Sequence, residues 1–246
     1  MLLLTGCAAG VVNTIAGAGS FLTLPVLIWL GGLDPKLANG TNRIAILLSS
    51  ASATATFHRY GHFDRRLTFR LVVPTLIGTP AGALLAIHLP PDAFQRAFGA
   101  LFLLMAVLFL FQPRRLLETN RQPLRSAAAE MVLFFGIGVY IGFIQAGMGL
   151  LLLLGLSLFH ARELVGANAV KNAIGFCVTL LALVVFVAHG QVRWAPGLVM
   201  ALGNVVGGYL GAHLAIRRGQ KFILAVLVIV MVATGLKLLW PGHAAS

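Results

Sequence analysis

Apolar residues fill most of the chain, in long stretches that short polar loops separate. The chain has 246 residues, of which 59% are hydrophobic and 10% are charged. A run of about 20 apolar residues is enough for a helix to cross a bilayer, and the stretches lack the strict alternation of transmembrane strands. The pattern therefore predicts an all-α polytopic membrane protein.

Glycine interrupts two of the apolar stretches, at places that correspond in the two halves of the chain. Gly17 and Gly19 form the first break, and Gly147 and Gly149 form the second. The pieces that flank the breaks are too short to cross a bilayer alone. They cover residues 2–16, 21–30, 131–146 and 150–159. Because glycine destabilises a helix interior, paired breaks of this kind indicate the binding site of a secondary transporter.

Six further apolar stretches are long enough to span the membrane. They cover residues 39–57, 71–89, 94–111, 168–188, 194–214 and 222–239. The two halves overlay at a shift of about 130 residues, which places Asn39 on Asn168 and Gly61 on Gly190. This register predicts an internal duplication. It divides the chain into a first membrane repeat, a linker and a second membrane repeat, over residues 1–112, 113–128 and 129–246.

The net charge of +12 comes from basic residues that gather in short loops, at 58–70, 113–125 and 217–221. Such clustering is typical of membrane orientation, and no basic face or stacking surface suggests nucleic acid. If each glycine-broken pair is a hairpin, each half makes three crossings and the second half is inverted relative to the first. All three basic loops then share one face, which the positive-inside rule makes cytoplasmic, and both termini lie outside.

Two other arrangements of the broken pairs stay open. A single kinked crossing for each pair would move one basic loop to the opposite face and weaken the charge asymmetry. Two short spanning helices for each pair would have the same parity as a re-entrant hairpin, so the charges do not distinguish these two. We expect inverted repeats, each with three spanning helices and one glycine-broken hairpin.

The breaks also suggest the chemistry of the site. The first turn of a helix presents unpaired N–H groups and a positive dipole end, and two such ends facing one cavity suit a small anion. Each half adds a carboxamide and a cation after its break, with Arg43 in the first and Lys171 in the second. A cation within a membrane span indicates function. The predicted substrate-binding residues are Gly17, Gly19, Ser20, Asn39, Thr41, Asn42, Arg43, Gly147, Gly149, Asn168, Lys171 and Asn172.

Structural explanations exist for the same residues. The glycines also permit close helix packing, and long cationic side chains near span ends can extend to water. Asn13, Gln145 and Asn204 are further polar residues in apolar surroundings, where ordinary interhelical hydrogen bonds explain them equally well. Ser49, Ser50 and Ser52 belong to a small-residue segment and favour packing.

The carboxylates lie in loops or at span edges. They are Asp34, Asp64, Asp92, Glu118, Glu130 and Glu163. A cation carrier needs an acid near the centre of a span, so an anion is the better substrate. The sequence also lacks a zinc motif, an aspartate pair and a serine elbow, so we expect no catalytic residue, no metal and no cofactor. A phosphate-binding loop is absent as well, which makes a gradient the driving force.

Several of these motifs resemble those of the sulfite exporter TauE/SafE family of membrane permeases. Residues 13–25, 38–43 and 57–61 are similar to its first repeat, and residues 136–149 and 167–172 to its second. The resemblance implies a bacterial inner-membrane carrier for sulfite, sulfonates or related small organic anions, with about eight membrane segments.

The sequence therefore predicts a secondary transporter of small anions that works by alternating access at a site between the two repeats. A passive anion channel is the alternative. The predicted partners are the anion and the lipid bilayer. The sequence does not decide between a monomer and a homodimer. The two breaks differ in one residue, since Met148 is bulkier than its counterpart Ala18. We expect this difference to make the two half-sites unequal.

Overall fold

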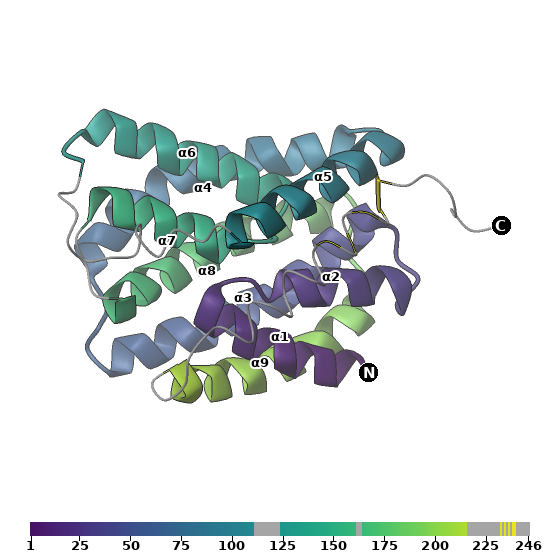
Figure 1. Cartoon of the computed structure of the whole chain (residues 1–246), viewed down its shortest axis with the longest axis horizontal. Coiled ribbons are helices and arrows are strands. Elements are labelled where there is room, and N and C mark those ends of the chain that lie inside the picture. Colours follow the sequence, from purple (N-terminus) through teal and green to yellow (C-terminus); the bar gives the residue numbers. More distant parts are fainter. Residues whose placement is uncertain are drawn as a thin grey trace.

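Helices make up the regular structure of the described part of the chain (Figure 1). The computed structural model describes residues 1–110, 124–160 and 164–215, with isolated positions at 232, 234, 236, 238 and 239. The helices are α1 (Leu2–Ala16), α2 (Ser20–Trp29), α3 (Pro35–Arg59), α4 (Arg65–His88), α5 (Pro91–Leu110), α6 (Ala127–Phe143), α7 (Met148–Phe159), α8 (Leu164–Ala188) and α9 (Trp194–Ala215). The prediction of an all-helical protein is confirmed.

Parts of the predicted arrangement fall outside the described residues. These are positions 113–123 of the linker, the basic loop at 217–221 and nearly all of the last span at 222–239.

Capping residues extend two helices beyond the apolar stretches that predict them. Asp34 accepts hydrogen bonds from the amides of Lys36 and Leu37 at 3.0 and 3.1 Å, and Pro35 begins α3. Asp64 caps α4 in the same way. Both helices therefore start before their apolar stretch. The predicted loop at 58–70 is too long, because residues 60–64 alone connect α3 to α4.

Three helices of the described chain are long and apolar enough to cross a membrane. They are Arg65–His88, Pro91–Leu108 and Val165–Ala188. α3 has 25 residues, but small polar side chains lower its hydropathy, and many of its residues are buried in the bundle. Shorter apolar helices complete the bundle, among them the four that flank the glycine breaks.

Two pairs of helices pack backbone to backbone. Gly82 of α4 lies on the carbonyl of Val139 in α6, and Gly142 of α6 lies on the carbonyl of Thr79 in α4. A Cβ atom at either glycine would overlap that oxygen. α1 and α9 form a matching contact, through Gly6, Gly10, Gly203 and Gly207. In the overlay of the two halves, α1 corresponds to α6 and α9 to α4, so the two close contacts also correspond.

The bundle has two distinct ends. At one end, Glu130 near the start of α6 pairs with Arg70 of α4 and with His160 after α7. At the other end, Lys36 of α3 donates to the carbonyls of Ile87 and Leu89 at the end of α4. The helices α6 and α7 thus form a hairpin that starts and ends at the Glu130 end. Figure 1 shows the N terminus and the α2–α3 connection together at the opposite end, so α1 and α2 form a second hairpin.

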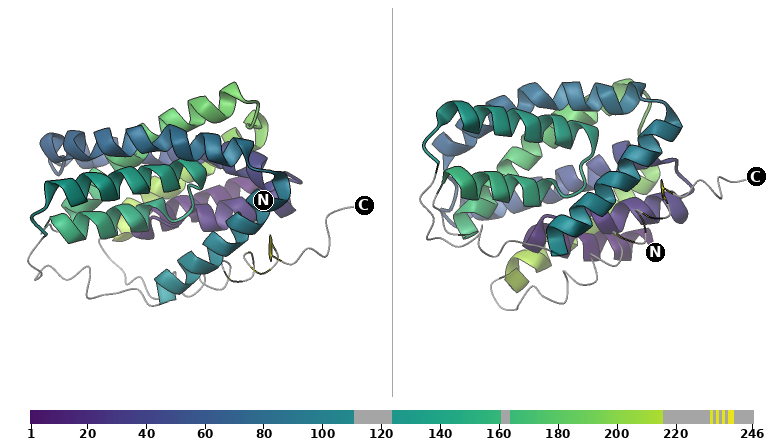
Figure 2. Two further views of the ribbon diagram at one scale, coloured as in Figure 1. Left: turned by 90° about the horizontal axis from the view of Figure 1, so that it is seen from above. Right: turned by 45° about the horizontal axis from the view of Figure 1, so that its top comes forward.

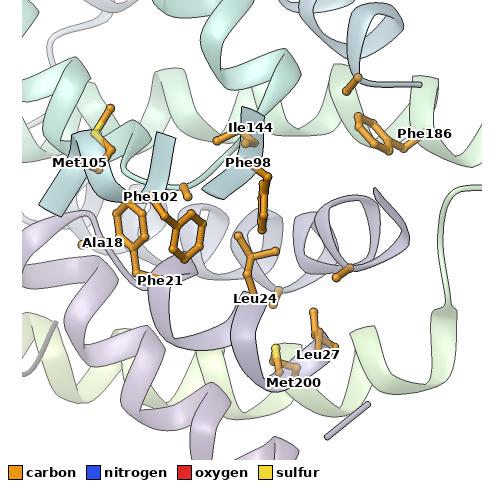
Figure 3. Packing of buried hydrophobic residues seen from close by; sticks show 14 of the residues in the cluster. Ala18, Phe21, Leu24, Leu27, Phe98, Phe102, Met105, Ile144, Phe186 and Met200 are labelled. Carbon is orange, nitrogen blue, oxygen red and sulfur yellow. The ribbon is translucent and has the colours of Figure 1, made fainter. Parts of the chain in front are cut away.

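Helix α5 crosses the other helices obliquely (Figure 2) and contributes a row of phenylalanines. Phe98 and Phe102 lie 4.9 Å apart between ring centroids, and Phe102 meets Phe21 of α2 edge to face at 4.9 Å. Figure 3 shows these rings together with Met105, on the side of the bundle where α2 lies. The cluster fixes the first hairpin against α5.

Candidate functional site

The two glycine breaks touch each other inside the bundle. Gly17 has a φ of 68° and ends α1, and Gly147 has a φ of 77° and precedes α7. A Cβ atom on Gly17 would lie 2.5 Å from the Cα atom of Gly149. The half-helices that the sequence predicts after the breaks are present, with α2 starting at Ser20 and α7 at Met148. The backbones of the two hairpins therefore meet with no side chain between them.

The amides in the first turn of α2 form hydrogen bonds with carbonyl groups of the break that precedes it. The amides of Phe21 and Leu22 donate to the carbonyls of Ala18 and Gly19, at 3.1 and 3.0 Å. The amide of Gly17 donates to the carbonyl of Asn13 at 2.8 Å, so any backbone donor for a ligand at this end comes from residues 18–20. Residues 17–20 are all buried.

Asn42 connects α3 to the same first turn. Its Nδ2 donates to Oγ of Ser20 at 3.1 Å, and its Oδ1 accepts from Oγ1 of Thr23 at 2.5 Å. The structure thus brings two of the predicted site residues, Asn42 and Ser20, into direct contact.

Arg43 lies next to Asn42 but points to a different helix. Its guanidinium donates to the carbonyl of Ile141 at 3.1 Å and to that of Gly142 at 2.6 Å, and it lies 4.4 Å from the ring centroid of Phe186. These carbonyls belong to the last turn of α6, the negative end of its dipole. Asn39 adds a hydrogen bond to the carbonyl of Phe143 at 2.9 Å. Both side chains therefore hold the end of α6 in place.

Thr41 lies apart from the breaks. Its Oγ1 accepts a hydrogen bond of 3.0 Å from the amide of Arg193, the residue that precedes α9. The structure therefore places Thr41 against the connection between α8 and α9.

Lys171 is the second buried cation, with 3% of its surface exposed. Its Nζ donates to Oδ1 of Asn168 at 2.8 Å, and Nδ2 of Asn172 donates to the carbonyl of Asn168 at 2.8 Å. The ion pairs among the described residues all involve Glu130, so neither Arg43 nor Lys171 has a carboxylate partner there. An uncompensated charge in a membrane span is costly and indicates a ligand.

The structure does not bring the two cations to one point. Helices α3 and α8 run antiparallel, because Gly40 contacts Phe186 while Ser50 lies beside Gly175. Arg43 is at the Phe186 end, and Lys171 precedes Phe186 by 15 residues, about 22 Å of helix. The two cations therefore lie on opposite sides of the region where the breaks meet.

Further buried polar side chains surround the breaks. Nδ2 of Asn13 lies 3.5 Å from Oγ of Ser49, and Nε2 of Gln145 lies 2.5 Å from Oγ1 of Thr179. The sequence identified Asn13 and Gln145 as polar residues in apolar context without a defined role. Thr179 carries no sequence signal of its own, beyond lying eight residues after Lys171 on the same helix.

Comparison with known proteins identifies the family. The family model described as "Sulfite exporter TauE/SafE" matches residues 2–238. The chain belongs to the sulfite exporter TauE/SafE family. The resemblance seen in the motifs is thus confirmed over nearly the full length.

Curated relatives of this family member are named as transporters. "Probable membrane transporter protein YfcA" of Escherichia coli (strain K12) is 30% identical over 99% of this chain and 90% of its own. "Probable membrane transporter protein ORF9" of Sinorhizobium sp is 29% identical over 98% and 96%. No solved structure matches the chain significantly. The protein is therefore a multi-pass member of a transporter family with bacterial relatives, and not an enzyme.

Proposed function

We propose that this TauE/SafE family member is a secondary transporter of small anions, most directly sulfite, sulfonates or related organic anions. The observation that carries the proposal is the contact between Gly17 and Gly149, with Lys171 and Arg43 buried nearby and no described carboxylate paired with either. Paired helix breaks supply N–H donors at the middle of a membrane, and the buried Lys171 supplies the charge that an anion requires.

Inverted repeats are part of this proposal. The two close-packed helix pairs correspond in the overlay of the halves. The aligned glycines Gly61 and Gly190 both adopt left-handed conformations, with φ of 75° and 69°. The α1–α2 hairpin starts at one end of the bundle and the α6–α7 hairpin at the other (Figure 1). These features support two repeats of opposite orientation.

The charges of the described residues support an orientation in a bacterial inner membrane. The Glu130 end carries Arg59, Arg65, Arg66, Arg70 and Arg125. At or near the opposite end lie three basic residues, Lys36, Arg96 and Arg193, and two acidic ones, Asp34 and Asp92. The Glu130 end therefore has the greater excess of positive charge. We assign the Glu130 end to the cytoplasm, which places the N terminus outside.

The predicted site residues then divide into two groups. In our proposal the break residues Gly19, Ser20, Gly147 and Gly149 donate hydrogen bonds to the anion, and Asn42, Asn168, Lys171 and Asn172 add side-chain contacts and charge. Gly17 contributes by letting the two breaks touch, because its own N–H donates to the carbonyl of Asn13 at 2.8 Å. Arg43, Asn39 and Thr41 contribute mainly by holding α6 and α9, because their polar groups already contact these elements. Rocking of one hairpin and its neighbours against the other would expose the site alternately to the two sides.

Reconstitution tests the proposal. Purified protein in liposomes is presented with a panel of sulfur oxyanions and carboxylates, sulfite and sulfoacetate included, and uptake is measured against protein-free liposomes. We expect saturable uptake of at least one small anion. Folded protein that moves none of the anions would contradict the proposal.

A further inference from the structure

A second group of polar side chains meets at the α6–α7 break. Gln145, in the extended segment before Gly147, is 1% exposed and donates to Oγ1 of Thr179 on α8. Its Nε2 also lies 3.9 Å from Sδ of Met148, the first residue of α7. The break therefore directs one amide and one thioether against α8.

Met148 occupies the space that Gly175 leaves open. A Cβ atom at Gly175 would lie 2.9 Å from the terminal methyl of Met148 and 3.5 Å from Oγ of Ser50 on α3. One small region thus contains the Met148 thioether and the Ser50 hydroxyl, with Gln145 and Thr179 adjoining it. Lys171, Gly175 and Thr179 follow each other at intervals of four residues, so they share one face of α8.

Two polar atoms in this region have no hydrogen-bond partner within the described chain. They are Oγ of Ser50 and Oε1 of Gln145, and both side chains are buried. A buried polar atom without a partner destabilises the folded state, so it needs an explanation such as an absent ligand. The Ser50 hydroxyl can donate to an anion, whereas Oε1 of Gln145 is an acceptor. Gln145 would therefore meet an anion through the second proton of Nε2, which now faces Sδ of Met148. The Thr179 hydroxyl accepts from Gln145 and keeps its own proton, which makes it a further donor.

The first break has no equivalent of this region. In the overlay of the halves, Ala18 corresponds to Met148, and Ile15 corresponds to Gln145. The two hydroxyl residues do correspond to each other, since Ser50 aligns with Thr179. Ser50 of α3 and Thr179 of α8 therefore both lie at the second break. Along α8, Gly175 is about one helical turn and Thr179 about two turns from Lys171.

We infer that Gln145, Ser50 and Thr179 bind the oxygen atoms of the transported anion, and that Met148 limits the size of the anion that fits. The inference rests on the proposed function and specifies its substrate as a compact oxyanion. Three neutral donors with one nearby cation suit a charge spread over several oxygens. Methionine has a flexible side chain that fills irregular space, and it closes the remaining volume of the region over Gly175.

Substitution of Met148 tests the size limit. Uptake of sulfite by proteoliposomes is measured in competition with methanesulfonate, ethanesulfonate and benzenesulfonate. We expect Met148→Ala to improve competition by benzenesulfonate at least about fivefold, because removing the thioether opens space. Met148→Leu, which keeps the volume, should retain the wild-type order.

Substitution of the polar groups tests the donors. Gln145→Leu, Ser50→Ala and Thr179→Val should each raise KM for sulfite roughly tenfold, as expected for loss of a hydrogen bond to a charged group. Ser52→Ala removes a hydroxyl from another face of α3 and should leave KM unchanged. Size-exclusion profiles and melting midpoints establish that each variant is folded.

The outcomes are distinguishable. If wild-type protein transports sulfite but Met148→Ala leaves the competition series unchanged, or the three donor variants keep wild-type KM, the inference is overturned. Absence of flux in the wild-type protein for every anion would contradict the proposed function itself and the inference with it.

Discussion

The two buried cations differ in what surrounds them. Arg43 has carbonyl partners at the end of α6 and an aromatic ring beneath it, whereas Lys171 donates to the Asn168 side chain. Removal of each side chain should therefore affect a different property of the protein.

Lys171→Ala should weaken anion binding with little loss of stability. A charge-assisted hydrogen bond contributes about 1.5–3 kcal/mol, so we expect KM for the transported anion to rise roughly tenfold or more. Arg66→Ala removes the same charge from an exposed position and should leave KM unchanged. Uptake kinetics measure both, and an unchanged KM for Lys171→Ala would remove this lysine from the site.

Arg43→Ala should instead lower stability. It leaves the carbonyls of Ile141 and Gly142 without their donors, which costs about 2 kcal/mol or more. Arg43→Lys should fall between wild type and alanine, because an ammonium cannot reproduce the forked contact. Melting midpoints in detergent measure the effect. A midpoint equal to wild type for Arg43→Ala would contradict the structural role.

At the scale of elements, glycine acts in two distinct ways. Gly17 combines a left-handed backbone with close contact to Gly149, whereas Gly61 has φ of 75° and no neighbouring atom within 4 Å of its Cβ position. Gly61→Ala should lower the free energy of unfolding by only about 1 kcal/mol, the strain of placing alanine in a left-handed backbone. Gly17→Ala should lower the free energy of unfolding by several kcal/mol, because the new methyl group also forces the two hairpins apart.

Melting midpoints of the two variants, with uptake measured in parallel, check this expectation. Equal destabilisation of Gly17→Ala and Gly61→Ala would show that the breaks do not need to touch.

Close packing of α4 against α6 can be tested in the same way. Gly82→Ala should destabilise the protein by about 1–3 kcal/mol, since its Cβ would overlap the carbonyl of Val139. Gly136→Ala is the matched control on α6, at an exposed position with open space around it. Because alanine has a higher helix propensity than glycine, this control substitution should leave stability unchanged or raise it slightly. Equal effects would contradict the close contact described for these helices.

The sequence predicts the elements well where one local cause acts. The bounds of α1 agree with the apolar stretch at 2–16, and α2 starts one residue from its predicted position. The predicted end of α6 lies three residues too far along the chain. The helix ends at Phe143, because Ile144 is extended with φ of −138° although its side chain is apolar. Hydropathy does not distinguish an extended apolar segment from a helical one.

The site was predictable only in part. Glycine pairs and polar residues in apolar context identify the breaks, Asn42 and Lys171. The partners of Arg43 lie about 100 residues further along the chain, and no local pattern indicates that α6 ends beside it. The separation of Arg43 from Lys171 likewise follows from the antiparallel packing of α3 and α8, which the sequence does not show.

For the whole molecule, we propose that the two hairpins form one site that opens alternately to the two sides. The ends of the bundle differ in charge, and both hairpins reach the interior from opposite ends (Figure 1). Such an arrangement requires a substrate-occupied intermediate in each cycle. A passive channel that uses the same basic residues has no such requirement.

Counterflow in proteoliposomes tests this claim most directly. Liposomes are loaded with unlabelled sulfite, and the initial uptake of labelled sulfite is compared with uptake into empty proteoliposomes at matched ionic strength. We expect internal sulfite to accelerate uptake and the uptake rate to saturate with external concentration. Flux that is linear in concentration and indifferent to internal sulfite would contradict alternating access and indicate an anion channel.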